Sequence, residues 1–422
     1  MQSPDFPTAA RTEPSFALSR RELVIMLALT QAFQALAIDS VLPGLGELSR
    51  DLKAADPNQG QLVVGLFLIG IGLGALLPGP LADRFGRKPV LLTSVLASSA
   101  ITLVCMLIQT IDQMLVLRFL GGLIYAGLAV VPPAIIRDRF EGDRMASLQS
   151  MIGVIFLVVP MVAPSVGQLI LLFVGWRWIF GFIALLGLAM TLWIALRLPE
   201  TLDPSNRQRI DPRSIGRNIR EITTTRASFG YVLGGMVSVG VLWGYIQSSQ
   251  QLVGDHFGAG RAFPLFFGGM ALAMAVANLT NSRIVERFGA RRVAHTALFV
   301  YIALALIQYH LAHRGAETLW QFVPMMTLTM MCMGFTGANF AAIALQPFAR
   351  MAGAASSVQT FVRSSLGGLI AAFIGQAYDG SARPFSSALV VGGVMILLLI
   401  LWSENGRLFR RLHPRGTQPP IA

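Results

Sequence analysis

Long apolar segments alternate with short polar ones along the whole sequence, and this pattern limits the fold more than any other feature. Each apolar segment exceeds the roughly 20 residues that a helix needs to cross about 30 Å of hydrocarbon. Membrane-spanning strands would be about ten residues long and would alternate apolar with polar side chains. The expected spans are 22–46, 60–82, 88–110, 112–136, 146–173, 176–198, 228–253, 262–285, 291–312, 318–347, 353–378 and 383–404. The sequence therefore predicts an all-α integral membrane protein with twelve transmembrane helices.

The composition agrees with a chain surrounded by lipid. Hydrophobic residues make up 54% of the 422 residues and charged residues only 13%, whereas soluble domains carry about 25% charged residues. Residues 1–21 contain no apolar core and no cleavage site, so we expect the first apolar segment to be a retained helix rather than a signal peptide. Cys105 and Cys332 both lie inside apolar segments, where a disulfide is not expected.

The basic residues show which loops face the cytoplasm. With the N-terminus placed inside, 25 Lys and Arg residues fall in the inner loops and tails. Six fall in the outer loops: Arg50, Lys53, Arg177, Arg261, Arg314 and Arg383. Inner loops of membrane proteins carry the excess of positive charge. This asymmetry predicts a multi-pass protein of the bacterial inner membrane with both termini in the cytoplasm. It also accounts for the net charge of +12 without a nucleic-acid partner.

The sequence repeats itself about its midpoint. The loop Asp83–Lys88 reads DRFGRK and the loop at 286–291 reads ERFGAR, at a constant offset of 203 residues. Each follows the second span of its half, which predicts two pseudo-repeated six-helix bundles with a substrate site between them. The expected parts are an N-terminal tail (1–21), a first bundle (22–198), a cytoplasmic linker (199–227), a second bundle (228–404) and a C-terminal tail (405–422).

Three charged residues lie clearly inside the predicted spans, where charge is costly and usually functional. Asp39 is about 25 Å along the first helix from Glu22, and Arg118 is about 9 Å below the outer surface in the fourth helix. Their depths match, so we expect them to pair. Burial favours the protonated form of a carboxyl group, whereas a neighbouring guanidinium favours the ionised form. Asp39 is therefore either a proton-linked switch or one half of a static ion pair. Arg363 lies near the midplane, where it either binds an anionic or carbonyl group of a substrate or caps broken backbone.

Two further segments carry local signals. In the loop Gly79–Pro89, proline ends the helix, glycine permits a tight turn, and Asp83 is expected to face the positive end of a neighbouring helix. Helix 5 contains Pro160, Pro164 and Gly167. Prolines kink helices and small residues allow close packing, so this helix is interpreted either as a hinge or as a packing surface.

These motifs resemble those of the major facilitator superfamily. The loop Gly79–Pro89 is similar to the family's loop signature, followed by Arg118 in an Arg-Phe-Leu-x-Gly setting and by Ala163-Pro164-x-x-Gly167. Ile38–Pro43, Gly175–Phe180 and Leu198–Thr201 resemble the Bcr/CflA-type drug:proton antiporters in particular. The resemblance covers the first half and is fainter in the second. The chain departs from the family pattern at Gly121, where glutamine is usual, and at Val41, where tyrosine is usual.

The resemblance implies a major facilitator fold and specific roles for the residues that match it. Asp39 would take the proton and Arg118 would tune it, while Asp83 and its loop would latch the cytoplasmic face against the start of helix 11. Helices 1, 4, 7 and 10 would line a central cavity. The candidate cavity residues are Gln31, Tyr125, Trp243, Gln247, Met333 and Asn339, together with Arg363 of helix 11. The candidate cytoplasmic gate comprises Gly79, Asp83, Arg84, Gly86, Arg87, Lys88, Glu286 and Arg287.

The expected function is secondary active transport: proton-coupled efflux of small drug-like or largely uncharged organic molecules, as in antibiotic resistance, by alternating access. A metabolite exporter, a nutrient:proton symporter and, more distantly, a non-transporting sensor are the alternatives. An enzyme is not expected, because His310 and His313 lack a third metal ligand and no Walker-type loop is present. The expected partners are a small-molecule substrate, protons and the bilayer. No metal and no cofactor beyond the proton gradient are predicted, and a monomer is expected.

Overall fold

The computed structural model describes residues 18–410, except 57, 141, 208–215, 217–219 and 316. Throughout this described part the regular structure is helical, without strands. The helices of the first half are α1 (Arg20–Asp39), α2 (Leu45–Asp51), α3 (Gln59–Gly74), α4 (Pro78–Phe85), α5 (Arg87–Cys105), α6 (Ile111–Arg139), α7 (Gly142–Val174) and α8 (Arg177–Arg197). Those of the second half are α10 (Arg226–Ser249), α11 (Phe263–Phe288), α12 (Ala290–Arg314), α13 (Leu319–Leu345), α14 (Ala352–Gln376) and α15 (Arg383–Ser403).

The twelve predicted spans correspond to these helices. Ten stretches are long and apolar enough to cross a membrane, and α3 with α4 forms one more span that is bent by 47°. The remaining span is α7, of which residues 158–174 form a shorter apolar stretch in the described part. The all-α membrane fold is therefore confirmed.

Two spans differ from the continuous helices that hydropathy predicts. The first breaks after Asp39 into a 3-10 turn, η1 (Leu42–Gly44), before α2 begins. Pro43 has no N–H to continue the helical hydrogen bonds, which explains the break. The span that contains α10 ends in a π-helix, η3 (Gln250–His256). Single π-helical turns of this kind occur frequently at functional sites.

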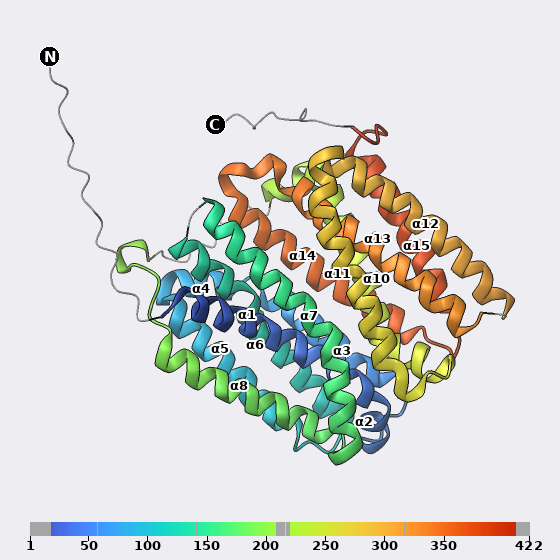
Figure 1. Ribbon diagram of the computed structural model, residues 1–422, viewed down its shortest axis with the longest axis horizontal. Helices are drawn as coiled ribbons and strands as arrows, with labels where there is room; N and C mark the ends of the chain where they lie inside the picture. Colours follow the sequence, from blue (N-terminus) through green and yellow to red (C-terminus); the bar gives the residue numbers. More distant parts are fainter. Residues whose placement is uncertain are drawn as a thin grey trace.

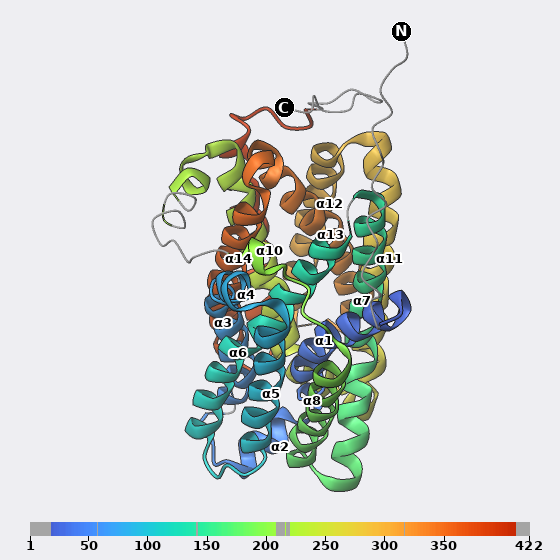
Figure 2. The same cartoon turned by 90° about the vertical axis from the view of Figure 1, so that its left-hand side faces the viewer.

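The two halves lie side by side, the first drawn in blue to green and the second in yellow to red (Figure 1). They pack along two seams, α3 against α14 and α7 against α11 (Figure 2). Glycine makes the first seam close, because a Cβ on Gly72 would overlap the backbone nitrogen of Ser365. Of the ten stretches that are long and apolar enough to cross a membrane, those that contain α1 and α10 are the most buried, so these two are the central helices of their halves.

We call the end of the bundle at which α1 and α10 begin the tail end, and the opposite end, at which α2 ends, the far end. Each half closes on itself at the tail end. Arg197 of α8 forms an ion pair of 2.9 Å with Glu22 of α1, and Arg226 of α10 donates to the Trp402 carbonyl of α15 at 2.8 Å. Large apolar side chains such as Phe173 and Phe373 are more than three-quarters exposed along the flanks, as expected for surfaces that face lipid.

A far-end loop between α12 and α13 holds an unpaired carboxylate outside the membrane-spanning helices. Both carboxylate oxygens of Glu317 are buried and have no hydrogen-bond partner among the described residues. Burial raises the pKa of Glu317 to about 7. Because the folded-state pKa lies above the unfolded value, ionisation of Glu317 costs stability, and the cost grows as pH rises from about 4.5 to above 7.

We therefore expect Glu317→Gln to raise the melting temperature at about pH 8, by roughly 2–4 °C, and to leave it unchanged at about pH 3, where the carboxyl is protonated in both states. Asp379→Asn is the control with the opposite sign. Hydrogen bonding from the Ser381 hydroxyl lowers the pKa of Asp379, so this carboxylate stabilises the fold at neutral pH and the substitution should lower the melting temperature. A Glu317→Gln effect that is equal at both pH values would contradict the assignment.

Candidate functional site

Asp39 lies at the break in the first span. It is the last residue of α1 and is 4% exposed. The C-terminal end of a helix carries the negative end of the helix dipole, which does not favour an ionised carboxylate. A buried acid at a helix break in mid-membrane is a common element of ion and substrate sites in transporters.

Arg118 of α6 reaches the same level of the bundle but binds other partners. Its Nε donates to the Val63 carbonyl at 2.9 Å and its Nη2 to the Ala37 carbonyl at 3.1 Å. The guanidinium also lies 3.9 Å from the centroid of the Phe67 ring. The matched depths are thus confirmed, because Ala37 is two residues from Asp39.

The expected ion pair is wrong, since Asp39 and Arg118 form none within 4.0 Å among the described residues. The physical reason is that the backbone carbonyls of α1 and α3 take the donors of Arg118. Arg118 therefore fixes the position of the helix that carries Asp39, and Asp39 remains without a basic partner.

Helix α7 packs directly against the break beside Asp39. A Cβ on Gly167 would overlap the carbonyl oxygen of Ser40, and the Ser40 hydroxyl is buried without a partner in the described part of the chain. Pro160 and Pro164 lie inside a helix that continues through both. Gly167 thus acts as a packing surface, which is one of the two interpretations of helix 5.

Six of the seven candidates for the central cavity fall into two groups, and the seventh, Gln247, is buried beside a cavity at the far end. Gln31, Trp243 and Arg363 are half-buried. Arg363 lies against Gly235 of α10 and makes no hydrogen bond or ion pair with any residue that the structure describes. An unpaired guanidinium on α14, opposite the central helix α10, is free to bind a ligand group.

The other candidates are enclosed by their own halves. Tyr125 is fully buried, bonds Thr102 of α5 at 3.1 Å and stacks on Phe33 of α1. Asn339 donates to Asn281 of α11 at 2.8 Å, and Met333 is 4% exposed within the apolar core. Tyr125 and Asn339 thus bond partners within their own halves, and the assignment of all three residues to the cavity stays a prediction.

A cluster of uncharged polar side chains joins the halves at the far end. Asn58 donates to the Tyr378 carbonyl and accepts from Gln376, both at 2.8 Å. Gln61 of α3 donates to Gln251 of η3, and the Tyr378 hydroxyl donates to the Gln251 carbonyl at 3.2 Å. The sequence interpretation missed this cluster; amide side chains at the same ends of three spans were the available signal.

The loop between α4 and α5 holds an ion-pair cluster at the tail end. Arg87 is 3% exposed and pairs with Asp83 at 2.6 Å and with Asp138 of α6 at 2.7 Å. The residue at the positive end of α5 is Glu200, which accepts from the backbone N–H of Arg87 at 2.8 Å and of Lys88 at 3.3 Å. Asp83 is held by Arg87 and does not cap α5; whether it faces the start of helix 11 stays a prediction.

The remaining gate candidates lie in different environments. Gly86 has φ +111°, and a Cβ there would overlap Glu200, so glycine is required. Gly79 sits within α4 in ordinary contact with α6. Lys88 donates to the Ala195 carbonyl at 2.9 Å. The exposed Arg84 and Arg287 lie over the rings of the residues that follow them. The side chains of Glu286 and of residues 349–354, at the start of helix 11, are outside the described part, so the expected latch stays a prediction.

The second half repeats the arrangement at its own tail end. Gly289 has a positive φ of +87° before α12, and Gly86 likewise has a positive φ before α5. Arg291 pairs with Glu404 at 2.6 Å, and Tyr231 donates to the same carboxylate at 2.7 Å. Glu404 thus follows α15 as Glu200 follows α8, and the internal repeat extends to the contacts of the helix ends.

Comparisons with known proteins agree with this geometry. The sequence signature of the Major Facilitator Superfamily matches residues 27–372. The Bicyclomycin resistance protein homolog of Haemophilus influenzae is 28% identical over 384 residues, which is 90% of this chain and 94% of that protein. The multidrug resistance protein MdtL of Escherichia coli is 28% identical over 395 residues, covering 92% and 96%.

Two solved structures show the same fold at low sequence identity. One is a bacterial homologue of the human lysosomal transporter Spinster, with a TM-score of 0.68 and 15% identity over 92% of this chain and 95% of that chain. The other is the xylose transporter XylE from Escherichia coli, with a TM-score of 0.68 and 13% identity over 92% and 97%.

Proposed function

The chain belongs to the Major Facilitator Superfamily and is a membrane transporter rather than an enzyme, and we propose that it exports small, largely uncharged organic molecules in exchange for protons. The relatives named for resistance to bicyclomycin and to multiple drugs support the direction and the substrate class. We place the tail end in the cytoplasm of a bacterial inner membrane, because the loops and tails at that end carry most of the Lys and Arg residues.

Asp39 is the observation that carries the proposal. It is a buried acid with no ion-pair partner among the described residues, at a break in a central helix. An isolated carboxylate in such a position is costly, and protonation of Asp39 removes that cost. A substrate that binds at the same level either competes with this protonation or assists it. Arg118 supports the role by anchoring α1 to α3 and α6 next to Asp39.

The contacts at the two ends support alternating access. The far end is closed by the hydrogen bonds of Asn58 and Gln61 across the halves, which must break when the far end opens. The ion pairs of Arg87 and Arg291 lie within single halves at the tail end. Each half can therefore move as a rigid body while its own tail-end cluster stays intact.

The test uses the purified full-length protein in liposomes with an imposed pH gradient. We expect bicyclomycin or a phenicol antibiotic to drive a proton flux in the opposite direction to its own movement, and expression in a susceptible host to raise tolerance to the same compound. Proton flux in the same direction as the compound would instead indicate a symporter. No flux with any compound of this class would reject the proposal.

Arg363 favours a second candidate, the export of a metabolite that carries an anionic or carbonyl group. Its guanidinium has no partner in the described structure, and a bidentate ligand group would satisfy it. In the same liposomes, a stronger proton response to small carboxylates than to uncharged drugs, lost in Arg363→Gln, would favour this function.

A further inference from the structure

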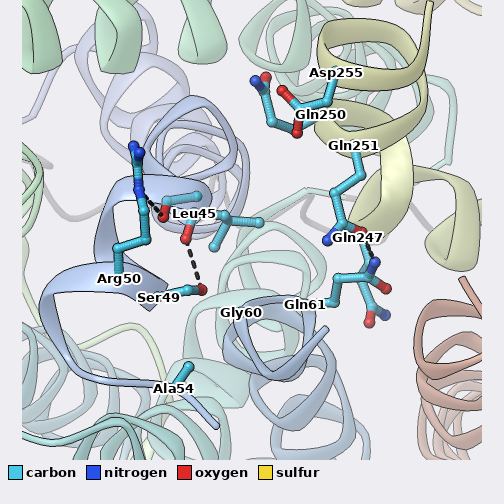
Figure 3. Close-up of a pocket in the computed structure, with 11 residues that line it drawn as sticks. Leu45, Ser49, Arg50, Ala54, Gly60, Gln61, Gln247, Gln250, Gln251 and Asp255 are labelled. Atoms are coloured by element: carbon cyan, nitrogen blue, oxygen red, sulfur yellow. Dashed lines mark hydrogen bonds between the residues drawn. The ribbon is translucent and has the colours of Figure 1, made fainter. Parts of the chain in front are cut away.

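A cavity of about 410 Å³ lies at the far end between the two halves (Figure 3). Its mouth is formed by the exposed residues Gly46, Arg50 and Asp255, and its floor includes the buried residues Gln61 and Gln247. Its volume falls in the range of about 300–1,000 Å³ that is typical of small-molecule sites. The cavity lies nearer the far end than Asp39 does, because its wall from α2 follows Asp39 and η1 along the chain.

The floor of the cavity holds an unsatisfied amide. Gln247 is 1% exposed, and neither its Nε2 nor its Oε1 has a hydrogen-bond partner among the residues that the structure describes. The Oε1 of the neighbouring Gln250 is also buried without one, whereas Gln61 and Gln251 bond each other. Buried amides are nearly always paired, since an unpaired one costs stability. Gln247 lines the cavity, so its unpaired amide can bond a ligand there.

The polar groups define the chemistry of that ligand. A glutamine side chain offers one acceptor beside one donor, which complements a group with an N–H next to a carbonyl. Arg50 and Asp255 place opposite charges at the mouth, so the site does not select for net charge. These residues do not line the cavity with charge of a single sign, which would favour an ion.

We propose that this far-end cavity binds a small uncharged molecule that presents an N–H donor beside a carbonyl acceptor. The inference rests on the proposed function, because both halves of the transporter build the site. Gln247 of α10 lies against Gly65 of α3, with 2.9 Å between its Oε1 and the Cβ position of that glycine. Opening the far end separates these walls, so the bound molecule holds the far end closed. The bound molecule is either the exported substrate itself or a regulator that enters from the medium.

Occupancy can be measured directly with a cysteine at the mouth. A Cβ at Gly46 meets nothing within 4 Å, so Gly46→Cys fits without displacement, and the native Cys105 and Cys332 are buried. Uracil, which has an N–H beside a carbonyl, is the probe. We expect it to slow alkylation of this cysteine by a membrane-impermeant maleimide about tenfold at ten times its dissociation constant. The matched compound 1,3-dimethyluracil, which lacks the N–H groups, should give no protection.

Two substitutions separate amide recognition from general effects. In the Gly46→Cys background, Gln247→Leu should abolish protection by uracil, while Gln308→Leu should leave it intact. Gln308 is also buried, with an amide that has no partner among the described residues. It lies in α12 and does not line this cavity, which makes it the matched control. Melting temperatures verify that both variants fold. The proposal is overturned if protection persists in Gln247→Leu or if 1,3-dimethyluracil protects equally well. It is also overturned if uracil gives no protection at a concentration about ten times the millimolar dissociation constant expected for so small a ligand.

A second arm identifies the source of the ligand. Gradient-dependent accumulation of labelled uracil in inside-out vesicles assigns the site to the exported substrate; slowed export of a second compound without accumulation assigns it to an external regulator. Export that stays unchanged while Gly46→Cys is fully protected contradicts the claim that occupancy holds the far end closed. Because the alkylation assay needs no gradient, a failure of binding is distinguishable from a failure of proton coupling.

Discussion

Replacing Asp39 with asparagine is expected to abolish transport driven by a pH gradient. The substitution keeps the size of the side chain and its ability to form hydrogen bonds but removes the titrating group. No basic residue pairs with Asp39 in the described structure, so its removal leaves no orphaned charge and the fold should persist. Coupling free energies of about 1–3 kcal/mol correspond to factors of about 5–150, and gradient-driven accumulation should fall by a factor in this range.

The measurement is substrate accumulation in inside-out vesicles with and without a pH gradient, alongside exchange of labelled for unlabelled substrate. Exchange needs no net proton movement, so it should survive in Asp39→Asn while the gradient response disappears. Asp112→Asn is the control, because Asp112 is exposed in the first turn of α6. A substrate-dependent proton flux that is unchanged in Asp39→Asn would remove Asp39 from the coupling mechanism.

The second large effect is expected from a single methyl group at Gly167. In most helices, glycine to alanine stabilises by about 1 kcal/mol. Here the added Cβ would overlap the Ser40 carbonyl, which is backbone and cannot rotate away. Helices α1 and α7 must separate, so we expect Gly167→Ala to destabilise the protein by about 1–3 kcal/mol. Transport should also fall, because the displaced segment carries Asp39.

Thermal unfolding of the purified variants tests this prediction. Gly269→Ala is the matched control: it lies in the transmembrane helix α11, and a Cβ there meets nothing within 4 Å. The two substitutions should shift the melting temperature in opposite directions. If Gly167→Ala melted at the wild-type temperature or above it, the close contact between α7 and the break in the first span would not exist in the protein.

The sequence by itself was sufficient for the architecture. Hydropathy placed the spans because a bilayer requires about 20 apolar residues from each helix, wherever its neighbours are. The repeat of Asp83–Lys88 at 286–291 revealed the two halves, and the structure extends it to Gly86 and Gly289. The depth of Asp39 and Arg118 also followed, since the rise along a helix is constant.

Only the tertiary structure decided which side chains meet. Arg118 binds the carbonyls of Ala37 and Val63 rather than Asp39, and Glu200 rather than Asp83 caps α5. In a membrane helix with apolar residues on all sides, periodicity does not reveal the rotation of the helix. The partners of Tyr125 and the unpaired amide of Gln247 therefore depend on how neighbouring helices are turned and how closely glycines let them approach, which no local pattern records.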